Sequence, residues 1–168
     1  MRFAPVSEAA GLCGDVETVL SANKTYTLSP APAAHFPDTG GELTDGVTAT
    51  GESWSQAAGW LYVDPTITLD LGAVFDLTRV ELYLGDSFGN GSFGVFRPAR
   101  AAVSVSNDGV LFTYVGDLSF NAWGAVGTKE QVDLGVATIG TLGRYVHLSI
   151  TAGGPWVMVT EVRVLGSP

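Results

Sequence analysis

The feature that most constrains this fold is a period-two alternation of apolar and polar residues, repeated in short runs from Lys24 onward. The run 66–71 reads Thr-Ile-Thr-Leu-Asp-Leu and sets Ile67, Leu69 and Leu71 on one face. Successive side chains of a β-strand point to opposite faces of the sheet, so this alternation is typical of a strand with one buried face. The pattern therefore predicts half-buried strands.

About eight such strands are predicted, with no convincing helix between them, at 24–29, 66–71, 77–84, 101–106, 111–115, 129–134, 144–151 and 156–165. The chain contains 22 glycines, which suit tight turns between short strands. Asn107-Asp108-Gly109 is a strong hairpin signal because Asp-Gly tolerates positive φ. An all-β fold, an antiparallel β-sandwich, is the architecture that these signals favour.

Residues 1–23 differ from the rest and are predicted to form an N-terminal arm before the sandwich domain of residues 24–168. Apolar side chains fall near helical spacing in this arm, at Val6, Ala9, Cys13, Val16 and Leu20. Gly11 and Gly14 weaken the case for a stable helix. We expect an arm with at most one short helix, packing on its own domain or forming an oligomer with a neighbour.

The net charge of −9, from 17 acidic and 8 basic residues, restricts the partners. An acidic surface repels phosphate backbones and anionic lipid headgroups, and no Lys/Arg cluster reverses this locally. No apolar run approaches the ~20 residues of a membrane helix. Nucleic acid and membrane are therefore excluded as expected partners, while cations, neutral ligands and proteins stay open.

Catalysis finds little support in the sequence. Cys13 is the single cysteine, so no intrachain disulfide can form, and His35 and His147 are the only histidines. Cys13 has no basic neighbour in sequence that would activate it. Zinc is not expected from one cysteine and two separated histidines, and no nucleophile elbow or phosphate loop is present. We expect a protein that is not an enzyme.

Several motifs occur in an order that carries a family likeness: 43–46 (Leu-Thr-Asp-Gly), Trp54, 67–72, 95–98, 103–109, 112–113, 144–146, Trp156 and 161–164. Together they resemble the discoidin family, also called coagulation-factor type C domains, and more narrowly bacterial galactose-binding-like carbohydrate-binding modules. The likeness covers about residues 24–166. It implies a jelly-roll sandwich with a ligand site made by loops at one end, and often one structural Ca²⁺. The cysteine pair of the animal members is absent, and the acidity argues against their phosphatidylserine-binding branch.

The loop 36–46 is the best metal candidate. Glycines allow tight turns, Asp38 and Asp45 supply carboxylates, and Ca²⁺ takes six to eight oxygen ligands, many from backbone carbonyls. The resemblance adds Glu161, because it places Asp45 and Glu161 where family members hold Ca²⁺. The alternative is that Asp38 and Asp45 cap turns. The predicted metal residues are thus Asp38, Asp45 and Glu161, with Ca²⁺ as a structural ion.

Three expected loops, 54–64, 86–97 and 119–125, could form the ligand face. Sugar sites pair an aromatic platform with polar groups that bind hydroxyls. The predicted ligand-binding residues are Phe88, Asn90, Phe93, Arg97, Asn121 and Trp123. The alternatives are that most of these aromatic residues are core, that the glycine-flanked phenylalanines form a protein contact, and that Arg97 pairs with an acid such as Asp86.

The function expected from these observations is a non-catalytic binding module for neutral carbohydrate. The alternative is a structural virion protein, a phage capsid decoration or tail component, that uses the sandwich for assembly or host-glycan adsorption. Residues 1–23 do not read as a secretory signal, since Arg2 is their only basic residue and acids interrupt the apolar core. The expected location is extracellular or at the cell surface for a domain of a secreted protein, and the virion for a phage protein.

Overall fold

The computed structural model describes residues 17–48, 56–85, 94–123 and 132–167. Within these ranges the chain forms nine strands and no α-helix. The strands are β1 (Thr18–Val19), β2 (Thr25–Ser29), β3 (Ala58–Leu61), β4 (Thr66–Gly85), β5 (Arg100–Ser106), β6 (Thr113–Asp117), β7 (Ser119–Trp123), β8 (Val132–Thr151) and β9 (Trp156–Ser167). All pairings between these strands are antiparallel. The all-β antiparallel fold class predicted from the alternation is confirmed.

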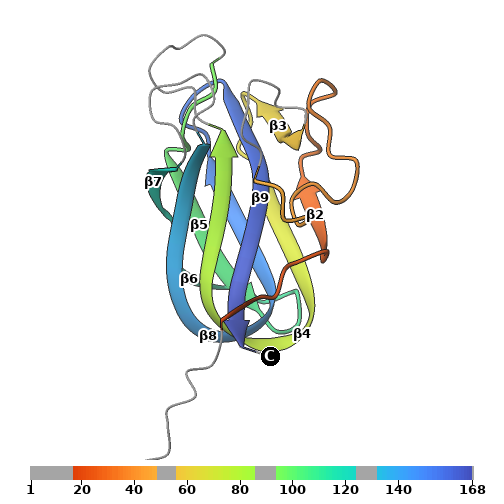
Figure 1. Cartoon of the computed structure of the whole chain (residues 1–168), viewed down its shortest axis with the longest axis vertical. Helices are drawn as coiled ribbons and strands as arrows, with labels where there is room; N and C mark the ends of the chain where they lie inside the picture. Colours follow the sequence, from red (N-terminus) through yellow and green to blue (C-terminus); the bar gives the residue numbers. More distant parts are fainter. Residues whose placement is uncertain (1–16, 49–55, 86–93, 124–131, 168) are drawn as a thin grey trace, which may run out of the picture.

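Two strands of 20 residues each, β4 and β8, organise the architecture. They pair from Thr66 opposite Ser149 to Gly85 opposite Val132, with one register shift between Asp70 and Phe75 and a second between Leu77 and Arg79. Before the first shift β4 pairs with β2, and after it β4 pairs with β9. Both strands bend there, so one continuous ladder supplies two layers, β2–β4–β8–β5–β6 and β9–β4–β8–β7 (Figure 1).

The bend depends on close approach of the chain at glycine. Gly72 has φ of +86°, a left-handed conformation that side chains other than glycine rarely adopt. At Gly143, on β8, a Cβ atom would lie 2.1 Å from the side chain of Val105 on β5. Together they let β4 and β8 pass from one layer to the other without a break in the strand.

The core lies between the two layers and follows the predicted alternation. Ile67, Leu69 and Leu71 are fully buried, and Leu148 and Val146, the register partners of Ile67 and Leu69 on β8, are buried beside them. Burying each of these side chains contributes roughly 1.5–3 kcal/mol relative to leaving it exposed. Trp60 on β3 is also buried, and its indole N–H donates to the carbonyl of Pro30, as expected for a tryptophan of the core.

The sandwich has two distinct ends. At the bend end lie the turns of β4 and β8, the β5–β6 hairpin and the last residues of β9. At the opposite, open end β4 finishes at Gly85 and β8 begins at Val132, while β5 and β9 begin at Arg100 and Trp156 (Figure 1).

The structure merges the predicted strands 66–71 and 77–84 into β4, merges 129–134 and 144–151 into β8, and adds three strands to those predicted. Thr18–Val19 pairs with β9 and Leu20 is buried, so residues assigned to the arm contribute to the sandwich from Thr18 onward. Ser119–Trp123, expected within a loop, is strand β7 on the edge beside β8, where Phe120 packs over Gly135. The third is β3, Ala58–Leu61. The remainder of the predicted arm, including Cys13, lies outside the described residues.

No helix in the described ranges has the length and apolarity needed to cross a membrane.

Candidate functional site at the open end

The open end is built around Trp156, the first residue of β9. Leu61 of β3 pairs with it on one side, and Val95 forms an isolated parallel bridge with it. The backbone N–H of Trp156 donates to the carbonyl of Gly94, and its ring packs edge-on against Phe36 with centroids 5.2 Å apart. The half-buried Trp156 therefore fixes segments from three parts of the sequence, as expected for a structural tryptophan.

Among the described residues, Tyr62 is the most exposed aromatic residue at this end, with 76% of its surface accessible. Its φ of +56° is left-handed, which is strained for a residue with a Cβ. Its backbone N–H donates to the carbonyl of Pro155 at 2.7 Å, which holds this conformation. Strain of this kind is maintained only where the surroundings impose it, and it often marks a functional position.

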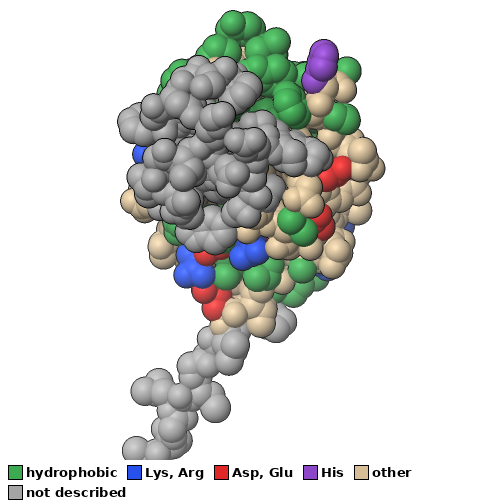
Figure 2. Space-filling model, turned by 45° about the horizontal axis from the view of Figure 1, so that its top comes forward, with side chains coloured by type: hydrophobic (Ala, Val, Ile, Leu, Met, Phe, Trp, Pro, Cys, Tyr) green, Lys and Arg blue, Asp and Glu red, His purple; other side chains and the backbone are tan. Residues whose placement is uncertain are grey.

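Three other apolar side chains are exposed at this end, two of them next to Tyr62 in the sequence. Leu61, Val63 and Phe96 are each 38–41% exposed. Phe96 packs beside Gly154, where a Cβ atom would come within 2.1 Å of its ring. Apolar side chains gather on the face of the molecule seen in Figure 2, on the side away from the bend end. An exposed aromatic residue among apolar neighbours is a surface that suits the C–H face of a sugar.

Arg97, a predicted ligand residue, is half-buried beside this surface. Its carbonyl oxygen would lie 2.0 Å from a Cβ atom at Gly153, so the two backbones touch. The next turn is fixed by Ala99, whose N–H donates to the carbonyl of Thr151. Asp64 links the end of β3 to the segment after β8, because its carboxylate accepts a hydrogen bond from the backbone N–H of Ala152 at 2.8 Å. Polar groups and aromatic rings thus share this end.

The other predicted ligand residues fall into two groups. Asn121 is exposed on β7, and Trp123 is the last residue of that strand. Trp123 and Gly85 are both register partners of Val132, so the ends of β7 and β4 flank the start of β8. The remaining three, Phe88, Asn90 and Phe93, lie outside the described residues.

Tyr62 was part of an expected ligand loop but was not among the predicted ligand residues. A sequence signal for it exists, since an aromatic residue two positions before Asp64-Pro65 ends a short apolar run. That signal indicates a turn but not the direction of the ring. The exposure depends on the left-handed backbone and on Pro155, which is distant in sequence.

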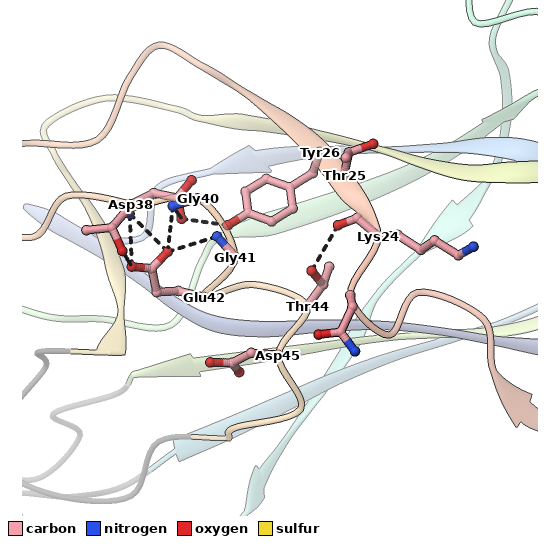
Figure 3. A pocket seen from close by; sticks show the side chains of 11 residues that line it. Lys24, Thr25, Tyr26, Asp38, Gly40, Gly41, Glu42, Thr44 and Asp45 are labelled. Carbon is pink, nitrogen blue, oxygen red and sulfur yellow. Dashed lines mark hydrogen bonds between the residues drawn. The ribbon is translucent and has the colours of Figure 1, made fainter.

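The predicted metal loop forms the wall of a separate hollow of about 520 Å³ on the side of the domain (Figure 3). The Tyr26 hydroxyl donates to the Asp38 carboxylate at 2.5 Å. The Glu42 carboxylate accepts N–H groups from Thr39, Gly40 and Gly41 at 2.9–3.1 Å. The loop therefore folds around the carboxylate of its own Glu42.

The pKa values in this hollow shift in opposite directions. Burial, followed by the hydrogen bond to Asp38, raises the pKa of Tyr26 above its usual range. Burial and the adjacent Glu42 raise the pKa of Asp38. The hydrogen bond with Asp38, assisted by Thr39, lowers the pKa of Glu42. Of the two carboxyl groups, Glu42 is therefore the one that stays anionic to lower pH.

Asp45 and Glu161 meet at a different point of the same loop. Glu161 on β9 is 1% exposed, and its Oε2 accepts the backbone N–H of Gly46 at 3.2 Å. The pKa of Glu161 is raised to about 7, chiefly by burial, and the nearby charge of Asp45 raises it further. The Arg163 guanidinium forms a salt bridge with the same carboxylate, with Nε 3.7 Å from Oε1, and its positive charge partly offsets these effects on the pKa of Glu161.

The Asp45–Glu161 pair fits Ca²⁺ in its chemistry. A buried carboxylate with a second carboxylate nearby favours a cation, and Ca²⁺ completes its shell with backbone carbonyls. Asp38 faces Tyr26 and Glu42 instead, away from Asp45 in the close view (Figure 3). In the part of the chain that the structure describes, no three Asp, Glu, His or Cys side chains converge on one point. Any Ca²⁺ here would therefore need carbonyl oxygens of the loop.

Comparison with known proteins places these features in a family. The model of the F5/8 type C domain matches residues 26–162. A search of curated proteins found no match. Solved structures match well: the family 32 carbohydrate-binding module of NanJ from Clostridium perfringens in complex with galactose has a TM-score of 0.61 at 13% identity, covering 89% of this chain and 99% of that one.

Two further similar structures were solved with or named for sugars. CpGH89CBM32-5 from Clostridium perfringens, in complex with GalNAc-beta-1,3-galactose, has a TM-score of 0.57 at 19% identity, covering 87% and 97% of the two chains. Chitosan-binding module 1 of a chitosanase/glucanase from Paenibacillus sp. IK-5 has a TM-score of 0.57 at 21% identity, covering 89% and 99%. At these identities the likeness shows the sandwich fold, and the family assignment rests on the matched model. The chain belongs to the F5/8 type C, or discoidin, domain family.

Proposed function

We propose that this chain is a non-catalytic carbohydrate-binding domain that holds a neutral sugar at the open end of its sandwich. The observation that carries the proposal is Tyr62, an aromatic ring 76% exposed on a backbone held in a left-handed conformation. Phe96 extends the apolar surface, and Arg97 and Asp64 supply polar groups beside it. Three similar structures are carbohydrate-binding modules, two of them solved with sugars.

The chemistry of this end favours a neutral ligand. The chain carries a net charge of −9, which disfavours acidic sugars by long-range repulsion. An aromatic ring contributes about 0.5–1.5 kcal/mol beyond the burial of its area when it packs against a complementary face. Glycans of this kind are displayed outside cells, so we place the domain at an extracellular or cell-surface location.

The direct test is binding of the purified protein to a glycan array that includes galactose, GalNAc-beta-1,3-galactose and chitosan oligosaccharides. A hit is then measured by titration calorimetry for the wild type, Tyr62→Ala and Tyr114→Ala. Tyr114 is a matched control, since it is 55% exposed but lies on β6. We expect a loss of about five-fold in affinity for Tyr62→Ala only. No retention of any glycan, or equal losses for both variants, would contradict the proposal.

We further propose that Asp45 and Glu161 hold a structural Ca²⁺ together with carbonyl oxygens of the loop. The support is the buried carboxylate of Glu161, the nearby charge of Asp45 and the contact of Glu161 with Gly46. Such an ion would join the early loop to the last strand, 115 residues apart, and so connect the two ends of the domain. Binding to the folded state alone raises stability by mass action.

A further inference from the structure

A groove of mixed polarity, flanked by exposed aliphatic side chains, lies at the bend end, opposite the proposed sugar site. It is a hollow of about 340 Å³ between the β5–β6 hairpin and the bend of β8, with Leu111 on one side and Leu142 on the other. Leu111 and its neighbour Val110 are both 77% exposed, and Leu142 is 61% exposed. Aliphatic side chains grouped this way mark a contact surface more often than isolated ones do.

The hairpin presents these side chains from a rigid turn. The Asp108 carboxylate accepts the backbone N–H groups of Val110 and Leu111 at 2.8 and 2.9 Å. The Ser106 hydroxyl donates to the same carboxylate at 2.9 Å and accepts the N–H of Gly109. The exposure of Val110 and Leu111 is therefore a fixed property of the turn.

The groove is too small to hold a second folded copy by itself. A stable interface buries about 800 Å² on each partner, which a few aliphatic side chains do not supply. A segment of the same chain needs to bury far less area to dock there. The covalent link makes the docking intramolecular, so most of the entropy cost of association is avoided.

Such a segment starts at the same end of the molecule. Thr18 on β1 is separated from Leu142 on β8 by the two strands β9 and β4. Thr18 pairs with Gly166 on β9, the next residue of β9, Ser167, pairs with Asp76 on β4, and Asp76 pairs with Leu142. These are three strand spacings, about 14 Å. The sixteen residues before Glu17 could reach about 50 Å when extended, so the groove is well within their range.

The segment carries apolar side chains that can cover the exposed leucines on the two sides of the groove. It contains the large apolar residues Phe3, Val6, Leu12 and Val16 among small ones, together with the charged residues Arg2, Glu8 and Asp15. We propose that residues 1–16 dock in the groove between Leu111 and Leu142 of their own chain. Docking would shield the aliphatic side chains of the hairpin and connect the start of the chain to the bend end.

Cys13, the single cysteine of the chain, gives a direct probe. A nitroxide label attached to Cys13 in the full chain broadens the NMR signals of nearby amides. We expect selective broadening at Val110, Leu111 and Leu142, and its loss in the double variant Leu111→Ser/Leu142→Ser. Both residues are exposed, so the variant should keep its melting temperature.

Two outcomes would overturn the proposal. One is broadening spread evenly over the bend end and unchanged in the double variant. The other is broadening of an isotope-enriched chain by a label carried only on an unenriched one, which would assign the groove to the arm of a second copy. The amides of Tyr62 and Phe96 report on the sugar site in the same spectra, so failure here is distinguishable from failure of the proposed function.

Discussion

The backbone N–H of Gly46 donates to the carboxylate of Glu161 across 115 residues of sequence, at 3.2 Å. The contact joins an irregular loop to a buried strand, and Gly46 reaches it through a φ of +86°. On the other side of the same glycine, its carbonyl accepts a hydrogen bond from Arg163 at 3.2 Å. The loop that precedes β3 is therefore held to β9 through the backbone N–H and the backbone carbonyl of Gly46.

Removal of Ca²⁺ should lower the melting temperature of the wild type, if Asp45 and Glu161 bind the ion as proposed. Glu161→Gln keeps the shape of the side chain and an acceptor for Gly46, but removes the negative charge. We expect the Ca²⁺-dependent increase in melting temperature to be abolished in this variant and in Asp45→Asn. Asp38→Asn is the matched control and should respond to Ca²⁺ as the wild type does, because Asp38 contacts Tyr26.

Scanning calorimetry with Ca²⁺ and with excess chelator measures this directly. An equal melting temperature under both conditions in the wild type would refute the metal proposal and leave the sugar proposal intact. Loss of the Ca²⁺ response in Asp38→Asn would instead restore Asp38 to the ligand set predicted from the sequence.

Strands could be predicted because one face of each is buried, so their side chains alternate. In the run 66–71, Ile67, Leu69 and Leu71 alternate with polar residues, and all three are fully buried. The continuity of β4 through its bend was not predicted, because Gly72 reads locally as a turn signal, which it also is. What keeps the strand continuous is pairing with β8, more than sixty residues later.

The candidate site was less predictable than the fold. Asp45 and Glu161 were brought together by family resemblance, since no local pattern relates residues this far apart. Tyr62 lay within an expected loop, but its exposure depends on a hydrogen bond with Pro155. Asn121 and Trp123 were expected in a loop and lie on β7, because pairing with β8 outweighs the weak local pattern of five residues.

The left-handed backbone of Tyr62 leads to a prediction in which two variants differ in stability but lose sugar affinity alike. Tyr62→Gly should raise the free energy of unfolding relative to Tyr62→Ala by about 1 kcal/mol, because glycine adopts this φ without strain. Both variants should lose sugar affinity, since both lack the ring. Urea unfolding and calorimetric titration measure the two quantities. A less stable glycine variant would show that the backbone is not strained in solution.

Gly153 should be essential to the geometry of the open end. A Cβ atom there would lie 2.0 Å from the carbonyl oxygen of Arg97, and backbone cannot move aside as a side chain can. We expect Gly153→Ala to lower the free energy of unfolding by about 1–3 kcal/mol and to weaken sugar binding. Gly140→Ala is the control, because a Cβ at Gly140 meets nothing within 4 Å. Equal unfolding curves for the two variants would contradict the close contact.

Acid should weaken the domain through the pair of Asp70 and Arg144, which joins β4 to β8 by two hydrogen bonds of 2.8 Å. The hydrogen bond from Arg144 lowers the pKa of Asp70 to about 2 from an ordinary value of 3.8. A carboxyl group with a lowered folded-state pKa stabilises the fold above its unfolded pKa, and this contribution disappears as the pH falls from about 4 to about 2.

The pair is about one-third exposed, so solvent screening limits its contribution to about 0.5–1 kcal/mol. Asp70→Asn should therefore be less stable than the wild type by this amount at pH 7, and the difference should shrink towards pH 2. Urea unfolding at a series of pH values measures it, with Asp117→Asn as a control for a more exposed pair, that of Asp117 with Arg100. A difference between Asp70→Asn and the wild type that stays constant with pH would show that the charge of Asp70 does not contribute through Arg144.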